Sequence, residues 1–277
     1  MAEGYNDLTK RIVIAIISIP LIVLIILEGE VLLFFILLLI LVSLGLDELF
    51  KMVHKIGFKP SFVWGFILAL YFIGTVFINF YNLKFFPYDQ ELVIILMIIF
   101  YSFVQLFKED YSKLLPNLSL SLFGGIYLGY LLSFILKIRL LPGGSHYLLS
   151  LLFTIWINDS AAYFIGTKYG KHKIFPQISP KKSMEGSIGG IIFSIFSVLL
   201  LKNWLNMEFT QLVPLGLVIA VTAQLGDFFE SMIKRCSGVK DSGNLIPGHG
   251  GILDRLDSIL FAAPVFYYYV IYSQAYI

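Results

Sequence analysis

Residues 217–266 read LVIAVTAQLGDFFESMIKRCSGVKDSGNLIPGHGGILDRLDSILFAAPVF and enclose a dense polar segment between two apolar runs. Charges beside or within a membrane are costly unless they are paired, metal-bound or hydrated. We therefore interpret the polar segment as the functional site and the rest of the chain as its scaffold. The acidic, basic and histidine side chains of the segment from Ser231 to Ser258 are Lys234, Arg235, Lys240, Asp241, His249, Asp254, Arg255 and Asp257.

The composition of the whole chain is that of a membrane protein. Of 277 residues, 58% are hydrophobic and 14% are charged, and the mean hydropathy is +0.86. The apolar runs are continuous rather than alternating, which favours helices over membrane strands. The predicted fold is all-α, a polytopic integral membrane helical bundle of about nine transmembrane helices. The expected spans are about 12–27, 31–46, 61–80, 91–107, 117–136, 147–166, 188–204, 211–233 and 258–275.

The distribution of basic residues predicts the orientation. With nine spans and a cytoplasmic N-terminus, all of the 20 Lys and Arg residues except Lys84, Lys137, Arg139 and Lys202 lie on the cytoplasmic side. The polar loops 167–187 and 234–257 then share that side and can form one site. We expect a single membrane domain, 1–277, with a helical scaffold over about 1–145 and catalytic helices and cytoplasmic loops over about 146–277. The lone Cys236 excludes an intrachain disulfide and a thiolate metal cluster.

Two pairs of carboxylates have helical spacing. Asp227, Glu230 and Lys234 fall at i, i+3 and i+7 on one helix face, and Asp254 and Asp257 are again i and i+3. Oxygen ligands without thiolates suit Mg²⁺. The alternatives are an intrahelical ion pair with Lys234, and acids that favour a helix N-terminus.

Glycine and lysine concentrate in the two polar loops. In KDSGNLIPGHGGIL, glycines let the backbone approach a phosphate, and His249 could serve as a phosphate contact, an acid–base group or a structural hydrogen-bond partner. The earlier loop follows Asn158 and Asp159 and contains SPKKSMEG, residues 179–186. Its lysines could neutralise a triphosphate or lipid head groups, or could simply set the topology. GTKYGKH lacks the P-loop spacing.

The pattern S-x-x-[apolar]-K-R-x4-K-D-x-G-x2-[apolar]-P-x-H-G-G-[apolar]-x-D-R-[apolar]-D, beginning at Ser231, resembles the signature of the phosphatidate cytidylyltransferases, or CDP-diglyceride synthases. NDSAAYFIG and SPKKSMEG are also similar to that family, so the resemblance covers about residues 155–260. It implies an integral membrane enzyme that converts CTP and phosphatidic acid to CDP-diacylglycerol and pyrophosphate with a divalent cation. It also implies a homodimer in a cell membrane of the bacterial inner type, with membrane lipid and no nucleic acid as partners.

The resemblance assigns roles to individual residues. Catalytic roles fall to Asp227, Asp254, Asp257, Lys234, Arg235 and His249. Mg²⁺ would be held by Asp227, Glu230, Asp254 and Asp257, and a second cation such as K⁺ is left open. The substrates would contact Asn158, Asp159, Lys181, Lys182, Ser183, Lys240, Asp241, Gly250, Gly251 and Arg255.

Two other functions compete with this interpretation. A cation- or proton-coupled transporter would use Asp159, Asp227 and Glu230 as an ion path, but the charges gather at one face and no symmetry between halves is visible. A CDP-alcohol phosphotransferase would need the pattern D-G-x2-A-R-x8-G-x3-D-x3-D, which the chain lacks.

Overall fold

A computed structural model describes residues 16, 18–83, 90–107, 111–245 and 250–275, and these form a helical bundle. A short helix over Ser18–Glu28 precedes the labelled helices. The labelled helices are α2 (Val31–Lys55), α3 (Phe62–Phe80), α4 (Gln90–Gln105), α5 (Leu114–Gly124), the π-helix η1 (Gly125–Tyr130), α6 (Leu131–Arg139), α7 (Gly144–Tyr169), α8 (Met184–Leu200), α9 (Lys202–Leu205), α10 (Phe209–Cys236) and α11 (Leu253–Ala275). Within these ranges the chain forms no strand, and an isolated antiparallel bridge joins Lys173 and Ser183.

The helices have the lengths that the apolar runs predict. Among the described residues, six helices are long and apolar enough to cross a membrane: Val31–Lys55, Phe62–Phe80, Leu114–Arg139, Gly144–Tyr169, Phe209–Cys236 and Leu253–Ser273. Three shorter apolar helices are Ser18–Glu28, Glu91–Val104 and Met184–Leu200. The all-α polytopic membrane architecture is confirmed, and the count of nine spans stays a prediction.

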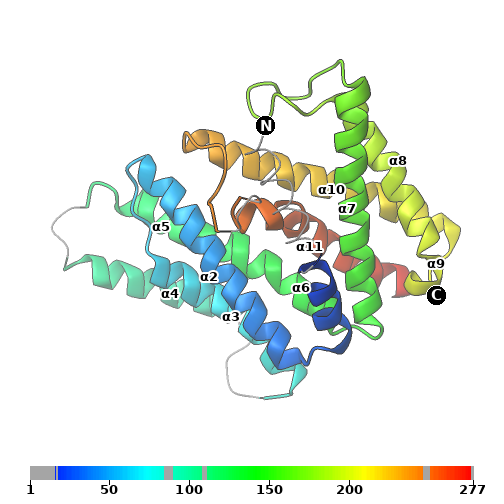
Figure 1. Ribbon diagram of the computed structural model, residues 1–277. Coiled ribbons are helices and arrows are strands. Elements are labelled where there is room, and N and C mark those ends of the chain that lie inside the picture. The colour runs from blue at the N-terminus through cyan, green and yellow to red at the C-terminus, as the bar shows by residue number, and fades with distance from the viewer. Residues whose placement is uncertain (1–15, 17, 84–89, 108–110, 246–249, 276–277) are drawn as a thin grey trace.

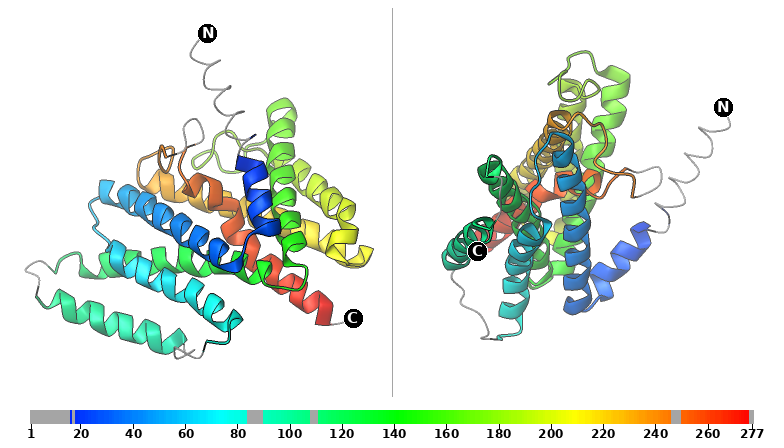
Figure 2. Two further views of the ribbon diagram at one scale, coloured as in Figure 1. Left: turned by 60° about the horizontal axis from the view of Figure 1, so that its bottom comes forward. Right: turned by 90° about the vertical axis from the view of Figure 1, so that its left-hand side faces the viewer.

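The last two long helices connect the two ends of the bundle. In Figures 1 and 2, α7, α8 and α9 lie at one end and α4 at the other, with α10 and α11 crossing between. Helix α10 packs on α8 and α11, and α11 also packs on α6. The shared core includes Leu46, Leu128, Leu136, Leu215 and Leu260, none of which has any exposed surface. This core supports the polar ends of α10 and α11.

Small residues bring the helices around the site into close contact. A Cβ atom at Gly190 of α8 would overlap the side chain of Asn158 on α7, and one at Gly226 of α10 would overlap the backbone carbonyl of Asp257 on α11. Membrane helices without a strong hydrophobic drive to associate commonly pack through such residues. The close approach at Gly226 places the neighbouring Asp227 beside α11.

Candidate active site

The two polar loops that the topology predicts on one side do meet. Arg235, at the end of α10, donates from Nε to the carbonyl oxygen of Ile178 at 3.0 Å. Lys182, from the same loop as Ile178, lies 2.5 Å from a carboxylate oxygen of Asp227 on α10. The convergence of the 167–187 and 234–257 segments is thus confirmed.

The loop between α7 and α8 is held in place by Glu185. Its carboxylate accepts hydrogen bonds from the backbone N–H groups of Lys171, at 3.1 Å, and His172, at 3.2 Å, and lies 2.6 Å from Nδ1 of His172. The N–H of its own residue and then the His172 side chain lower the pKa of Glu185 to about 2. Ser183 accepts from the N–H of Gly186 and caps α8. These contacts hold the loop, and the lysines that it carries, against the first turn of α8.

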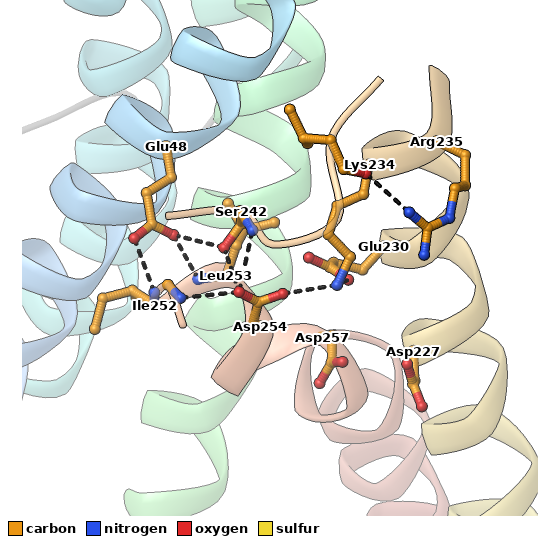
Figure 3. A network of polar contacts seen from close by, with 12 residues as sticks. Glu48, Asp227, Glu230, Lys234, Arg235, Ser242, Ile252, Leu253, Asp254 and Asp257 are labelled. Carbon is orange, nitrogen blue, oxygen red and sulfur yellow. Dashed lines mark hydrogen bonds and ion pairs between the residues drawn. The ribbon is translucent and has the colours of Figure 1, made fainter. Parts of the chain in front are cut away.

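Asp254 organises the loop before α11 (Figure 3). One of its oxygens lies 2.7 Å from Nζ of Lys234. The other accepts from the N–H and the hydroxyl of Ser242, at 3.1 and 2.9 Å, and from the N–H of Gly251 at 2.8 Å. A carboxylate in the first turn of a helix also interacts favourably with its dipole. The observed contacts of Asp254 are therefore those of a residue that shapes the site.

Lys234 on α10 forms an ion pair with Asp254 on α11 and so connects the two helices. Besides Asp254 it contacts Glu230, one turn earlier on α10, at 2.5 Å. The side chain of Glu230 is 0% exposed, and neither of its oxygens accepts a well-directed hydrogen bond from the described residues. The intrahelical pair that the spacing allowed is present. A fully buried carboxylate depends on such a cation, because an unpaired charge in a low-dielectric interior is strongly unfavourable.

Asp227 and Asp257 lie on the side of the site that is away from the loop before α11. They lie side by side on α10 and α11 (Figure 3), and the negative charges of Asp227, Glu230 and Asp159 repel that of Asp257. Asp257 accepts a hydrogen bond from the N–H of Ser258, at 2.6 Å. Four carboxylates thus lie within electrostatic reach of one another, and lysines contact two of them, Asp227 and Glu230.

A cavity of about 580 Å³ opens beside these carboxylates, between α7, α8, α10 and the 170–183 loop. Its size is within the usual range for small-molecule sites. Acidic and basic groups both face it, so it can hold a cation and phosphate groups together. Its charged and amide lining residues include Asn158, Asp159, Lys173, Lys181, Lys182 and Asp227.

An amide network fixes one wall of the cavity. Gln224 donates from Nε2 to Oδ1 of Asn158, at 3.0 Å, and to the carbonyl of Ser187, at 3.1 Å; the Ser187 hydroxyl donates back to Gln224. Asn158 in turn donates to Asp159 at 3.0 Å. Sequence reasoning missed Gln224, although it is a polar residue in an apolar run and lies one turn before Asp227.

The described residues contain no group of three His, Cys, Asp or Glu side chains arranged to hold a metal ion. Two lysines instead neutralise the carboxylates. The donor set nevertheless suits Mg²⁺ by type, because it offers only oxygen ligands and because neither Glu230 oxygen accepts a well-directed hydrogen bond within the described part of the chain. Asp227 and Glu230 each face one lysine, whereas Asp254 also accepts hydrogen bonds from Ser242 and Gly251, so Asp227, Glu230 and Asp257 are less occupied by protein donors than Asp254 is. Mg²⁺ binding by the four carboxylates stays a prediction.

The remaining predicted residues are distributed around this centre. Lys240, Asp241 and Arg255 are exposed. Gly250 has a φ of 82°, in the left-handed region that favours glycine. Gly251 donates its N–H to Asp254, as described above, so the two glycines shape the loop. His249 lies outside the described residues.

Glu48 on α2 is the charged residue of this centre that the sequence did not reveal. It is 6% exposed, accepts hydrogen bonds from the N–H groups of Ile252 and Leu253, and lies within hydrogen-bond distance of the Ser242 hydroxyl (Figure 3). It comes from the half of the chain that was expected to serve only as scaffold. Because its backbone partners lie 204 and 205 residues later in the chain, no local spacing could have predicted them.

Comparison with known proteins gives consistent matches. A model of the cytidylyltransferase family matches residues 9–273. The phosphatidate cytidylyltransferase of Bacillus subtilis (strain 168) is 32% identical over 270 residues, which cover 95% of this chain and 97% of the relative. The phosphatidate cytidylyltransferase of Thermotoga maritima is 41% identical over 166 residues, 57% of this chain and 61% of the relative. That of Staphylococcus aureus (strain COL) is 44% identical over 124 residues, 44% of this chain and 48% of the relative.

Proposed function

The chain belongs to the cytidylyltransferase family, and from that membership we propose that it forms CDP-diacylglycerol and pyrophosphate from CTP and phosphatidic acid. The observation that carries the proposal is the position of Asp227. This carboxylate lies beside Asp257, and it also lines a cavity that contains three lysines. Nucleotidyl transfer needs such a combination, a negative centre for a cation next to positive groups for phosphates.

The chemistry is an in-line displacement at phosphorus. A phosphate oxygen of phosphatidate forms a bond to the α-phosphorus of CTP, and the bond from that phosphorus to the bridging oxygen of pyrophosphate breaks. The electron pair leaves with pyrophosphate. Because the lipid phosphate is ionised near neutral pH, the reaction needs no strong general base, and positioning with charge stabilisation supplies the catalysis.

Different residues of the chain bind the phosphates and the cation. Lys173, Lys181 and Lys182 line the cavity and bind the phosphates of the nucleotide. Asp227, Glu230 and Asp257 would hold Mg²⁺, which when bound polarises a phosphoryl oxygen and neutralises developing negative charge. In the described structure Lys182 is paired with Asp227, so it is in place to move from the carboxylate to a phosphate oxygen.

Turnover tests both the reaction and the role of Lys182. Purified protein in liposomes with phosphatidic acid, labelled CTP and Mg²⁺ is expected to release CDP-diacylglycerol and pyrophosphate in equal amounts, and chelation of Mg²⁺ is expected to stop it. Lys182→Gln is expected to raise the KM for CTP about tenfold or more, because a charge-assisted hydrogen bond to phosphate contributes about 1.5–3 kcal/mol.

Lys202→Gln is the matched control, since Lys202 is exposed and pairs loosely with Glu208 at 3.9 Å. It should leave the KM unchanged. No product from folded wild-type protein across several lipids and divalent ions would reject the reaction and favour the transporter alternative, which ion-flux measurements in the same liposomes would detect.

We also propose that the site faces the cytoplasm, because the bias of basic residues places both of its loops there. Cys236 provides a direct probe, since it is exposed, unpaired and the only cysteine. A membrane-impermeant maleimide is expected to label Cys236 in inverted membrane vesicles and not in intact cells. As a control, Cys236→Ser combined with Lys202→Cys should show the opposite pattern. Labelling of Cys236 from outside intact cells would contradict the orientation.

A further inference from the structure

We propose that Glu48 is a positioning residue, which holds the first turn of α11 so that Asp254 and Asp257 present their carboxylates in the catalytic arrangement. This inference rests on the proposed function for its kinetic readout only. Glu48 itself lies on α2 and contacts neither the cavity nor the Asp227 side of the site. Its influence on the reaction is therefore transmitted through the backbone of α11.

The contacts of Glu48 are those of a helix cap supplied by a distant helix. Oε1 accepts from the N–H of Ile252 at 3.0 Å, and Oε2 accepts from the N–H of Leu253 at 2.9 Å. Helix α11 begins at Leu253. The N–H groups at a helix start have no acceptor within the helix, and a carboxylate there satisfies them and interacts favourably with the helix dipole. Glu48 thus replaces the local side chain that usually caps a helix.

Ser242 connects this cap to Asp254. Its Oγ lies 3.0 Å from Oε2 of Glu48 and 2.9 Å from Oδ2 of Asp254. The hydroxyl has one hydrogen, so it donates to one of these carboxylates at a time. Apart from Lys234 on α10, the remaining donors to Asp254 are the backbone N–H groups of Ser242 and Gly251, so a shift of the loop would change all of the loop's hydrogen bonds to Asp254 together.

Two glycines of the loop before α11 leave space for the Glu48 side chain. A Cβ atom at Gly243 or at Gly251 would overlap the Glu48 carboxylate. The loop before α11 therefore passes closely over this side chain at two points. In the described residues Glu48 makes no ion pair. Its buried charge is stabilised by the hydrogen bonds to the loop and to α11, which ties the position of α2 to that of the catalytic carboxylates.

Glu48→Gln removes the negative charge of the side chain and leaves its shape nearly unchanged. Glutamine retains the volume, but it has one acceptor oxygen, and its NH₂ group would face N–H donors. An unsatisfied buried donor is destabilising, so the start of α11 should loosen. We expect faster amide hydrogen exchange over residues 250–258 in the substrate-free protein. We also expect a kcat about 10- to 100-fold lower, as for other residues that orient a catalytic group, with the KM for CTP nearly unchanged.

Asp47→Asn is the matched control, because Asp47 is the neighbouring acid on α2, exposed and paired with Lys51 at 2.6 Å. It should change neither exchange nor kcat. Glu48→Gln with wild-type exchange over 250–258 would overturn the proposal, and so would faster exchange with a normal kcat. The exchange measurement needs no turnover, so a failure of the proposed reaction would be distinguishable.

If Glu48→Gln does not fold, Ser242→Ala decides the question, since it removes only the hydroxyl between Glu48 and Asp254. It is expected to speed exchange over 250–258 and to lower kcat to a smaller extent. Wild-type exchange and kcat in Ser242→Ala would then overturn the proposal.

Discussion

Replacing Asp257 by asparagine is expected to lower kcat for CDP-diacylglycerol formation on the order of 1,000-fold. A metal-binding carboxylate supports several kcal/mol of transition-state charge stabilisation, and each 1.36 kcal/mol is a factor of ten in rate. Asparagine keeps the shape and can still accept the hydrogen bond from the N–H of Ser258. What it removes is the negative charge. Initial rates at saturating CTP and phosphatidic acid measure the effect.

The same substitution should not destabilise the fold. Asp257 is repelled by Asp227, Glu230 and Asp159, so removal of its charge relieves repulsion between buried like charges. We expect a melting temperature equal to or above that of the wild type, together with the loss of activity. Asp47→Asn, which neutralises an exposed acid on α2, should leave both quantities unchanged. An Asp257→Asn enzyme with a near-normal kcat would contradict the role of this residue.

Replacing Lys234 by methionine is expected to destabilise the protein by about 3–5 kcal/mol, the usual effect of leaving buried charges without their partner. Glu230 is fully buried and Asp254 is 10% exposed, and both would lose the ammonium group between them. Thermal unfolding in a single detergent measures the change. At about 2–4 °C per kcal/mol for a chain of 150–250 residues, the melting temperature should fall by about 6 °C or more.

Two further variants show whether burial causes that effect. Lys51→Met removes an ion pair of the same one-turn spacing, with Asp47, but at an exposed position. Its effect should be within about 1 kcal/mol. Glu230→Gln combined with Lys234→Met should regain part of the lost stability without regaining activity. A Lys234→Met protein that unfolds at the wild-type temperature would show that the buried pairs are not needed for stability.

The apolar runs predicted most of the helices but not their ends. The run 31–46 continues as α2 to Lys55, and α11 begins at Leu253 rather than near 258. In both places the helix extends into polar sequence because one face remains buried. Leu49, Met52 and Val53 provide that face in α2. A hydropathy threshold ends a span at the first charges, whereas a helix continues as long as its buried face does.

The candidate site was predictable where its chemistry is local in sequence. Asp227 and Glu230, like Asp254 and Asp257, are recognisable from helical spacing and from the cost of charge in a membrane. Sequence could not show that the Asp254 carboxylate pairs with Lys234 and accepts a hydrogen bond from Ser242, because those contacts depend on how the loop folds back. Sequence also could not show the role of Glu48. This side chain accepts hydrogen bonds from backbone N–H groups, which every residue except proline possesses.

The binding of Mn²⁺ in the presence of CTP tests most directly whether the carboxylates of α10 and α11 hold the catalytic cation. Electron paramagnetic resonance of purified protein reports bound and free Mn²⁺ without any need for turnover. We predict a CTP-dependent site in the wild type and in Asp47→Asn, and at least a tenfold loss of Mn²⁺ affinity in Asp227→Asn and in Asp257→Asn. Unchanged Mn²⁺ affinity in both of these variants would contradict the assignment of the metal and the reaction to this centre.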